Sequence, residues 1–173
     1  MHGDHDAFGV LAERSLDRLV GTAGLILHDA DAAQDAAQDA LIRAWRDLPT
    51  LRNPDRFSAW LYRVLLNSCT DQQRRRKRHA HQALLPDHGG ATSDGAHAMA
   101  EREAIAAALD RLSDEHRTVV VLRYFGGLSQ PEIATAIGEP LGTVKSRLNR
   151  AVSYLRADLA ATERAPILGE GSA

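Results

Sequence analysis

The segment from Pro140 to Arg156 contains several cationic side chains and no acidic one. At about 100° per residue, its apolar residues from Val144 to Leu155 fall on one narrow stripe of a helix, and its polar residues face the opposite way. A polar, cationic face of this kind can pair with phosphates and donate hydrogen bonds to base edges. The segment predicts a DNA-binding helix, with an ordinary solvated helix face as the alternative interpretation.

A shorter helix is predicted directly before this segment. Ser129 and Glu132 have the spacing of a capping box, in which the hydroxyl accepts from a free backbone N–H and the carboxylate reaches back to the cap. Pro131 fits the first turn, where a missing N–H group costs nothing. The run from Gly138 to Pro140 ends the helix. A short helix, a tight turn and a longer basic helix together predict a helix-turn-helix, whose second helix can enter a DNA major groove.

The remaining sequence is also predicted to be helical, with no strand pattern in residues 1–80. Trp45 and Trp60 fall on apolar helix stripes, which favours core positions over stacking platforms. Ser113 is the expected N-cap of the helix that precedes the helix-turn-helix. Helical periodicity covers residues 8–23, 31–48, a helix that begins at Arg56 or Phe57 and runs into Arg74–Arg78, and residues 99–112.

The pattern changes between residues 81 and 98, which are rich in Gly, Asp, Ser and Ala and show no periodicity. This composition predicts a flexible linker. The fold class that follows is all-α, with two small helical domains at residues 1–80 and 99–161 and a disordered tail at residues 162–173. Because the linker has no apolar pattern that could fix the domains to each other, we expect few mutual contacts.

Composition limits the class of protein. The 173 residues are 44% hydrophobic but only 5% aromatic, and alanine is abundant, which favours packed helices. No apolar run is long enough for a membrane span, and the acidic, His-rich start does not resemble a signal peptide. The single cysteine, Cys69, excludes an internal disulfide, fits a reducing cytoplasm, and is predicted to be a small core residue.

Charge is segregated along the chain, although its net value is only −2. Aspartates are concentrated between Asp29 and Asp47, whereas bases are concentrated in Arg74–Arg78 and Lys145–Arg156. This distribution predicts one acidic surface for a protein partner and two surfaces that face phosphates.

Both halves of the chain resemble bacterial sigma factors of the extracytoplasmic-function (ECF) group. The sequence LSDEHRTVVVLRYFGGLSQPEIATAIGEPLGTVKSRLNRAVSYLR is similar to their C-terminal domain. DAAQDAAQDALIRAW is similar to their acidic core-binding helix, and RFSAWLYRVLLNSCTDQQRRRKR to their promoter-melting helix. The two motifs occur in the family's order and cover nearly the whole chain.

The resemblance implies a promoter-specificity subunit of RNA polymerase without chemistry of its own. Its partners would be promoter DNA and core RNA polymerase, through the clamp helices of the largest subunit and the flap of the second-largest. An anti-sigma factor is a further partner that the family allows. The polymerase-binding residues would be Asp35, Gln38 and Asp39, which lie three or four positions apart on one helix face. Without the family, an ordinary solvated face is the favoured interpretation.

The DNA-binding residues follow from the same resemblance. Lys145 and Arg150 are the best candidates for purine contacts, because cationic donors suit the O6 and N7 acceptors of guanine. The residues expected at the upstream, minus-thirty-five element are Gln130, Thr143, Lys145, Ser146, Arg147, Asn149 and Arg150, with Arg147 on the DNA backbone. The residues expected at the minus-ten element and in melting are Arg52, Asn53, Asp55, Phe57, Asn67, Arg74, Arg75 and Arg76.

Catalytic and metal sites are not expected, and neither is a cofactor. The pair His79 and His81 and the pair His2 and His5 lack nearby cysteines or carboxylates at the spacing of a structural site. There is no Gly-rich phosphate loop and no nucleophile elbow. Two other classes remain open from the residues alone: a helix-turn-helix repressor or activator, and a helical adaptor that binds proteins. The expected location is the bacterial cytoplasm, at the nucleoid.

Overall fold

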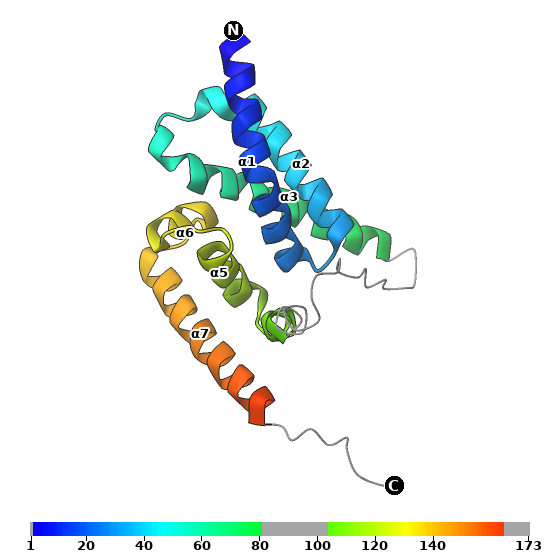
Figure 1. Cartoon of the computed structure of the whole chain (residues 1–173), viewed down its shortest axis with the longest axis vertical. Helices are drawn as coiled ribbons and strands as arrows, with labels where there is room; N and C mark the ends of the chain where they lie inside the picture. Colours follow the sequence, from blue (N-terminus) through cyan, green and yellow to red (C-terminus); the bar gives the residue numbers. More distant parts are fainter. Residues whose placement is uncertain (1, 81–103, 165–173) are drawn as a thin grey trace.

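The computed structural model describes residues 2–80 and 104–164, and every regular element in these ranges is a helix (Figure 1). The first unit contains α1 (His2–Leu27), α2 (Ala30–Asp47) and α3 (Phe57–Ala80), with the short 3-10 helices η1 (Leu48–Thr50) and η2 (Pro54–Arg56) between the last two. The second unit contains a helical segment at residues 104–110, α5 (Asp114–Tyr124), α6 (Gln130–Ile137) and α7 (Leu141–Arg164). The predicted all-α class is confirmed for these residues.

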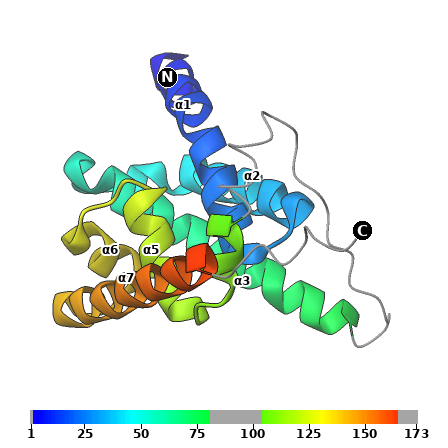
Figure 2. The same ribbon diagram turned by 60° about the horizontal axis from the view of Figure 1, so that its bottom comes forward.

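Small side chains bring the first three helices close together. The buried face of α2 consists of alanines, so the backbones of α1 and α3 can approach it closely. Asp29 is the N-cap of α2, and its carboxylate accepts a hydrogen bond of 2.7 Å from the Ala32 N–H. Trp45 and Trp60 pack against this core, as predicted. The Trp45 ring lies 5.0 Å from that of Phe8, where the N-terminal turns of α1 project beyond the body (Figure 1 and Figure 2).

The first helix of the helix-turn-helix, α6, begins and ends where the sequence predicts. The Ser129 N–H donates to the Glu132 carboxylate at 2.8 Å, and Ser129 Oγ accepts from the Glu132 N–H at 3.4 Å. The Ser129 hydroxyl, which also donates to this carboxylate, and the Ser129 N–H lower the pKa of Glu132. Gly138 ends α6 in the left-handed region at φ +74°, where a Cβ would be strained. The second helix, α7, begins at Leu141 and continues to Arg164, past the predicted domain boundary at residue 161.

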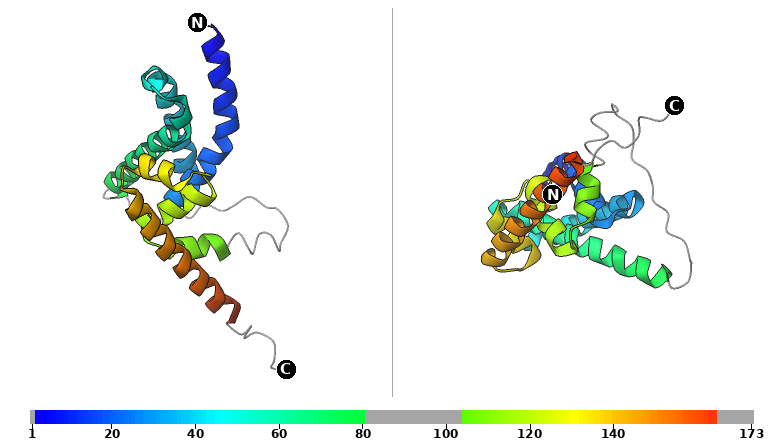
Figure 3. Two further views of the ribbon diagram at one scale, coloured as in Figure 1. Left: turned by 90° about the vertical axis from the view of Figure 1, so that its left-hand side faces the viewer. Right: turned by 90° about the horizontal axis from the view of Figure 1, so that it is seen from below.

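The two units are packed against each other, so the expectation of few mutual contacts is wrong. Helix α6 lies against α3, and α5 lies against α1 (Figure 3). Tyr62 of α3 is buried beside the turn after α5, where a Cβ on Gly126 would lie 3.2 Å from Tyr62 Cε1. The expectation was based on the composition of residues 81–98, which lie outside the described residues. Contact between the units depends instead on apolar residues of the helices themselves, so the composition of the linker could not predict it.

A polar contact supports the same packing. His28 Nδ1, at the end of α1, lies 2.8 Å from Asp110 Oδ1 in the second unit. Burial and the charge of Arg117 lower the pKa of His28 against the opposing effect of Asp110. Within the described residues, no helix combines the length and apolar character needed to cross a bilayer.

Candidate nucleic-acid interface

The outer face of α7 is built as the sequence predicted. Val144, Leu148 and Ala151 are buried against α5 and α6. The side chains expected to read DNA lie on the opposite, solvent-exposed face: Lys145, Ser146, Asn149 and Arg150. Thr143 is half-buried, and its carbonyl accepts a hydrogen bond of 2.9 Å from Ser146 Oγ. The exposed donors form a polar, cationic surface on a rigid helix, which is what groove binding requires.

Arg147 has a different environment from its neighbours on α7. Its side chain is only 19% exposed. The same nitrogen, Nη2, lies 2.9 Å from the carboxylate of Glu115 in α5 and 3.5 Å from that of Glu139 in the turn. In this structure Arg147 is therefore held inside the helix-turn-helix unit and apart from the exposed face.

The start of α6 is also partly occupied by internal contacts. Ser129 Oγ donates to the Glu132 carboxylate at 2.6 Å as well as capping the helix. Gln130, the first residue of α6, is half-buried beside this cap. Exposed apolar side chains that periodicity does not predict also lie in or next to the helix-turn-helix, among them Tyr124, Phe125, Leu141 and Tyr154.

The residues expected at the minus-ten element do not form one cluster. Arg52 and Asp55 are exposed in the loop before α3. Asn53 Oδ1 accepts a hydrogen bond of 2.9 Å from the Asp55 N–H and thereby caps η2. Phe57 is half-buried at the start of α3. Asn67 lies ten positions later, which corresponds to about 15 Å along a helix axis, so it does not lie beneath the loop.

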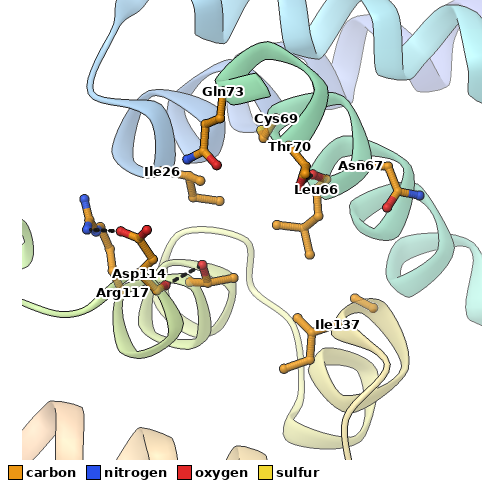
Figure 4. A pocket seen from close by; sticks show the side chains of 11 residues that line it. Ile26, Leu66, Asn67, Cys69, Thr70, Gln73, Asp114, Arg117 and Ile137 are labelled. Carbon is orange, nitrogen blue, oxygen red and sulfur yellow. Dashed lines mark hydrogen bonds and ion pairs between the residues drawn. The ribbon is translucent and has the colours of Figure 1, made fainter. Parts of the chain in front are cut away.

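Asn67 instead lines a cavity between the two units (Figure 4). The cavity has a volume of about 290 Å³. Leu66 and Thr70 of α3 line one side, and Ile137 of α6 lines the other. Arg117 lies at its edge, where Nη2 donates to the Asp114 carboxylate at 2.7 Å. Leu66 and Thr70 of α3 thus face the first helix of the helix-turn-helix, whereas Asn67 itself remains exposed.

Cys69 of α3 also lines this cavity and is 2% exposed. Burial raises the pKa of its thiol to about 12. Because the thiolate is the reactive form, we expect iodoacetamide at pH 8 to alkylate Cys69 roughly a thousandfold more slowly in the native protein than in urea. The chain has one cysteine, so mass spectrometry follows this reaction unambiguously. Equal rates in buffer and in urea would contradict the burial of Cys69.

The cationic end of α3 is mostly open to solvent. Arg74 and Arg75 are exposed. Arg76 Nη2 lies 3.1 Å from the carboxylate of Asp29, the N-cap of α2. Arg76 is therefore paired with the start of α2, and Arg75 is the better candidate for a phosphate contact.

The acidic face of α2 ends in an exposed apolar residue that charge patterning does not predict. Asp35 and Gln38 are exposed and Asp39 is half-buried. Ile42 is 67% exposed and lies one turn beyond Gln38 and Asp39 on the same face. The signal was present in the sequence, because Ile42 lies outside the alanine stripe of α2. An exposed apolar side chain beside carboxylates makes this face a candidate protein-binding surface.

Comparisons with known proteins place both units in one family. Residues 11–79 match sigma-70 region 2, and residues 102–155 match sigma-70 region 4. The chain is 32% identical to the RNA polymerase sigma-H factor of Pseudomonas aeruginosa, over 86% of this chain and 84% of that protein. It is 40% identical to the ECF RNA polymerase sigma factor SigL of Mycobacterium tuberculosis, over 76% of each chain.

Two solved structures have a similar fold. One is the sigma factor RpoE in complex with the anti-sigma factor NepR from Bartonella quintana, with a TM-score of 0.78, 26% identity and coverage of 89% of this chain and 97% of that one. The other is CnrH in complex with the cytosolic domain of CnrY, with a TM-score of 0.69, 31% identity and coverage of 91% and 90%.

These matches define a transcription initiation factor with a core-binding and a helix-turn-helix unit. The chain belongs to the sigma-70 family, in its ECF group. It is a promoter-specificity subunit of RNA polymerase and not an enzyme. The repressor and adaptor interpretations are thereby excluded. Among the described residues, no cluster of three potential metal ligands occurs.

Proposed function

We propose that the two units divide promoter recognition between them. The domain at residues 99–161 binds the minus-thirty-five element with the outer face of α7, and the domain at residues 1–80 binds core polymerase and opens the minus-ten element. The observation that supports this most strongly is the exposed, acid-free face of α7. Lys145 and Arg150 donate to guanine acceptors. Ser146 and Asn149 contact base edges or phosphates, and Gln130 and Thr143 lie beside the DNA backbone.

The minus-ten element is read by the loop before α3 and by α3 itself. Arg52, Asp55 and Phe57 surround the position where an unstacked base would enter, and a pocket is needed because flipping a base costs a few kcal/mol. Asn53 shapes this loop through its cap on η2. Asn67 contacts DNA further along α3, and Arg74, Arg75 and Arg76 bind phosphates without reading sequence.

The acidic face of α2 docks on the clamp helices of the largest polymerase subunit, and the helix-turn-helix unit contacts the flap of the second-largest. Asp35, Gln38 and Asp39 supply charge complementarity, and Ile42 supplies apolar area one turn further along α2. The protein acts in the cytoplasm, at the nucleoid, where its promoters are. As in the related complex of RpoE with NepR, an anti-sigma factor is a candidate partner.

Promoter binding requires the two units to separate. The names minus-ten and minus-thirty-five place the two promoter elements about 25 base pairs apart, which is roughly 85 Å of duplex at 3.4 Å per base pair. In the packed arrangement α6 lies directly on α3, so the two units cannot occupy both elements together. Core polymerase would hold them apart on the promoter.

Ile42→Ser tests the docking surface. We expect about tenfold weaker binding to core polymerase, because a buried isoleucine side chain contributes roughly 1.5–3 kcal/mol. Stability should hardly change, since Ile42 is exposed. Val10→Ser, which removes a side chain that is 48% exposed on α1, is the matched control. Equal binding by both variants in a pull-down titration would remove Ile42 from the interface.

Run-off transcription tests the function as a whole. Purified core polymerase with this protein should initiate at specific sites in a pool of genomic fragments, and core polymerase alone should not. If the protein binds DNA fragments but confers no initiation on core polymerase, the proposed function fails.

A further inference from the structure

Arg147 lies where three parts of the helix-turn-helix unit meet. Its Nη2 contacts Glu115 at the start of α5 at 2.9 Å and Glu139 in the turn at 3.5 Å, while its backbone belongs to α7. At about 100° per residue, it lies about 40° from the buried Ala151, whereas Arg150 lies about 100° from it. Arg147 therefore stands at the edge of the buried stripe, on the side of α7 that faces α5.

We propose that Arg147 is a positioning residue for reading the upstream element, in place of the DNA-backbone contact that the sequence predicted. The inference rests on the proposed function of α7. The two ion pairs fix the rotation of α7 about its own axis relative to α5 and the turn. They thereby set the direction in which Lys145, Asn149 and Arg150 project.

Small rotations matter for base reading. A helix with its side chains is roughly 10–12 Å across, so a rotation of about 10° moves the side-chain tips by about 1 Å. Hydrogen bonds to base edges weaken beyond about 3.2 Å. A modest loss of orientation therefore reduces sequence discrimination even when the helix remains folded.

The electrostatic surroundings favour the same role. Glu115 is 69% exposed and Glu139 is 39% exposed, so without Arg147 both carboxylates would be uncompensated beside a surface that faces phosphates. Because both carboxylates are open to solvent, which screens their pairing with Arg147, we expect the loss of these pairs to be evident mainly in DNA discrimination and only slightly in the melting temperature.

The test compares Glu115→Gln, Arg147→Gln and the exchanged pair Arg147→Glu with Glu115→Arg. Each variant is assembled with core polymerase, and run-off is measured on a promoter fragment found in the genomic pool and on the same fragment with one upstream-element base pair changed. Positioning by Arg147 predicts that both single variants lose discrimination by about tenfold and that the exchanged pair recovers most of it. Arg111→Gln, which removes an ion pair with Asp158 near the other end of α7, is the matched control and should discriminate like the wild type.

A phosphate contact predicts the opposite sign for one variant. Glu115→Gln would then free Arg147 and increase run-off from both fragments equally, and Arg147→Gln would decrease both equally; either result overturns the proposal. Recovery of the melting temperature without discrimination in the exchanged pair also overturns it, because the role would then be stability alone. If the wild-type protein itself shows no discrimination, the proposed function of α7 has failed, and the positioning role fails with it.

Discussion

Reversal of two charges on α2, Asp35→Lys together with Asp39→Lys, is expected to abolish co-purification of the protein with core polymerase. The acidic face would become cationic, and like charges placed opposite each other cost several kcal/mol, so binding should fall more than a hundredfold. The fold should persist, because Asp35 is exposed, Asp39 is half-buried and neither belongs to the buried alanine stripe.

The matched control carries the same charge change elsewhere. Glu13→Lys with Asp17→Lys alters two exposed residues of α1 at the same spacing of four positions, and this variant should bind core polymerase and support run-off normally. Circular dichroism checks that both variants are helical. If the α2 variant still binds and initiates like the control, the acidic face is only solvated and the docking assignment is wrong.

The local features of the fold could be predicted because they depend on neighbours in the sequence. The capping box of Ser129 and Glu132 and the stop at Gly138 are decided by backbone hydrogen bonds within one or two turns. The outer face of α7 follows from the helical period, since burial of Val144 and Leu148 fixes where Lys145 and Arg150 point. These features were confirmed where the structure describes them.

Features that depend on contacts between distant segments were beyond such reasoning. Packing of α6 on α3 depends on complementary apolar surfaces around Leu66 and Ile137, and periodicity within one helix does not reveal its partner. The separation of Asn67 from the loop, in contrast, follows from its place ten residues along α3. The environment of Arg147 also required coordinates, because Glu115 lies 32 positions away in the sequence.

Ile42 illustrates an intermediate case. Its place outside the alanine stripe of α2 is visible in the sequence. Charge patterning, however, indicates only the aspartates and says nothing of an apolar residue on the same face. An exposed apolar side chain is unremarkable by itself. It becomes informative when the structure shows that no other described element covers it.

Arg150→Ala is expected to weaken promoter binding most at one base pair of the upstream element, by roughly 1–3 kcal/mol, because a guanidinium that donates two hydrogen bonds to guanine distinguishes it from other bases. Arg150→Lys should retain binding but only part of the discrimination, since an ammonium group cannot form the same paired contact. Competition binding of the holoenzyme to promoter fragments, each with one base pair changed, measures both effects.

Arg75→Ala is the contrasting variant, because Arg75 is exposed in the cationic run at the end of α3. Without this phosphate contact, binding releases about one counterion fewer. Affinity should therefore fall alike for every fragment, and the slope of log affinity against log salt concentration should decrease by about one. Base reading by Arg150 therefore changes the ranking of fragments, whereas phosphate binding by Arg75 lowers all affinities and preserves the ranking. Uniform losses for both variants would show that Arg150 contacts the backbone, and the major-groove assignment of α7 would have to be abandoned.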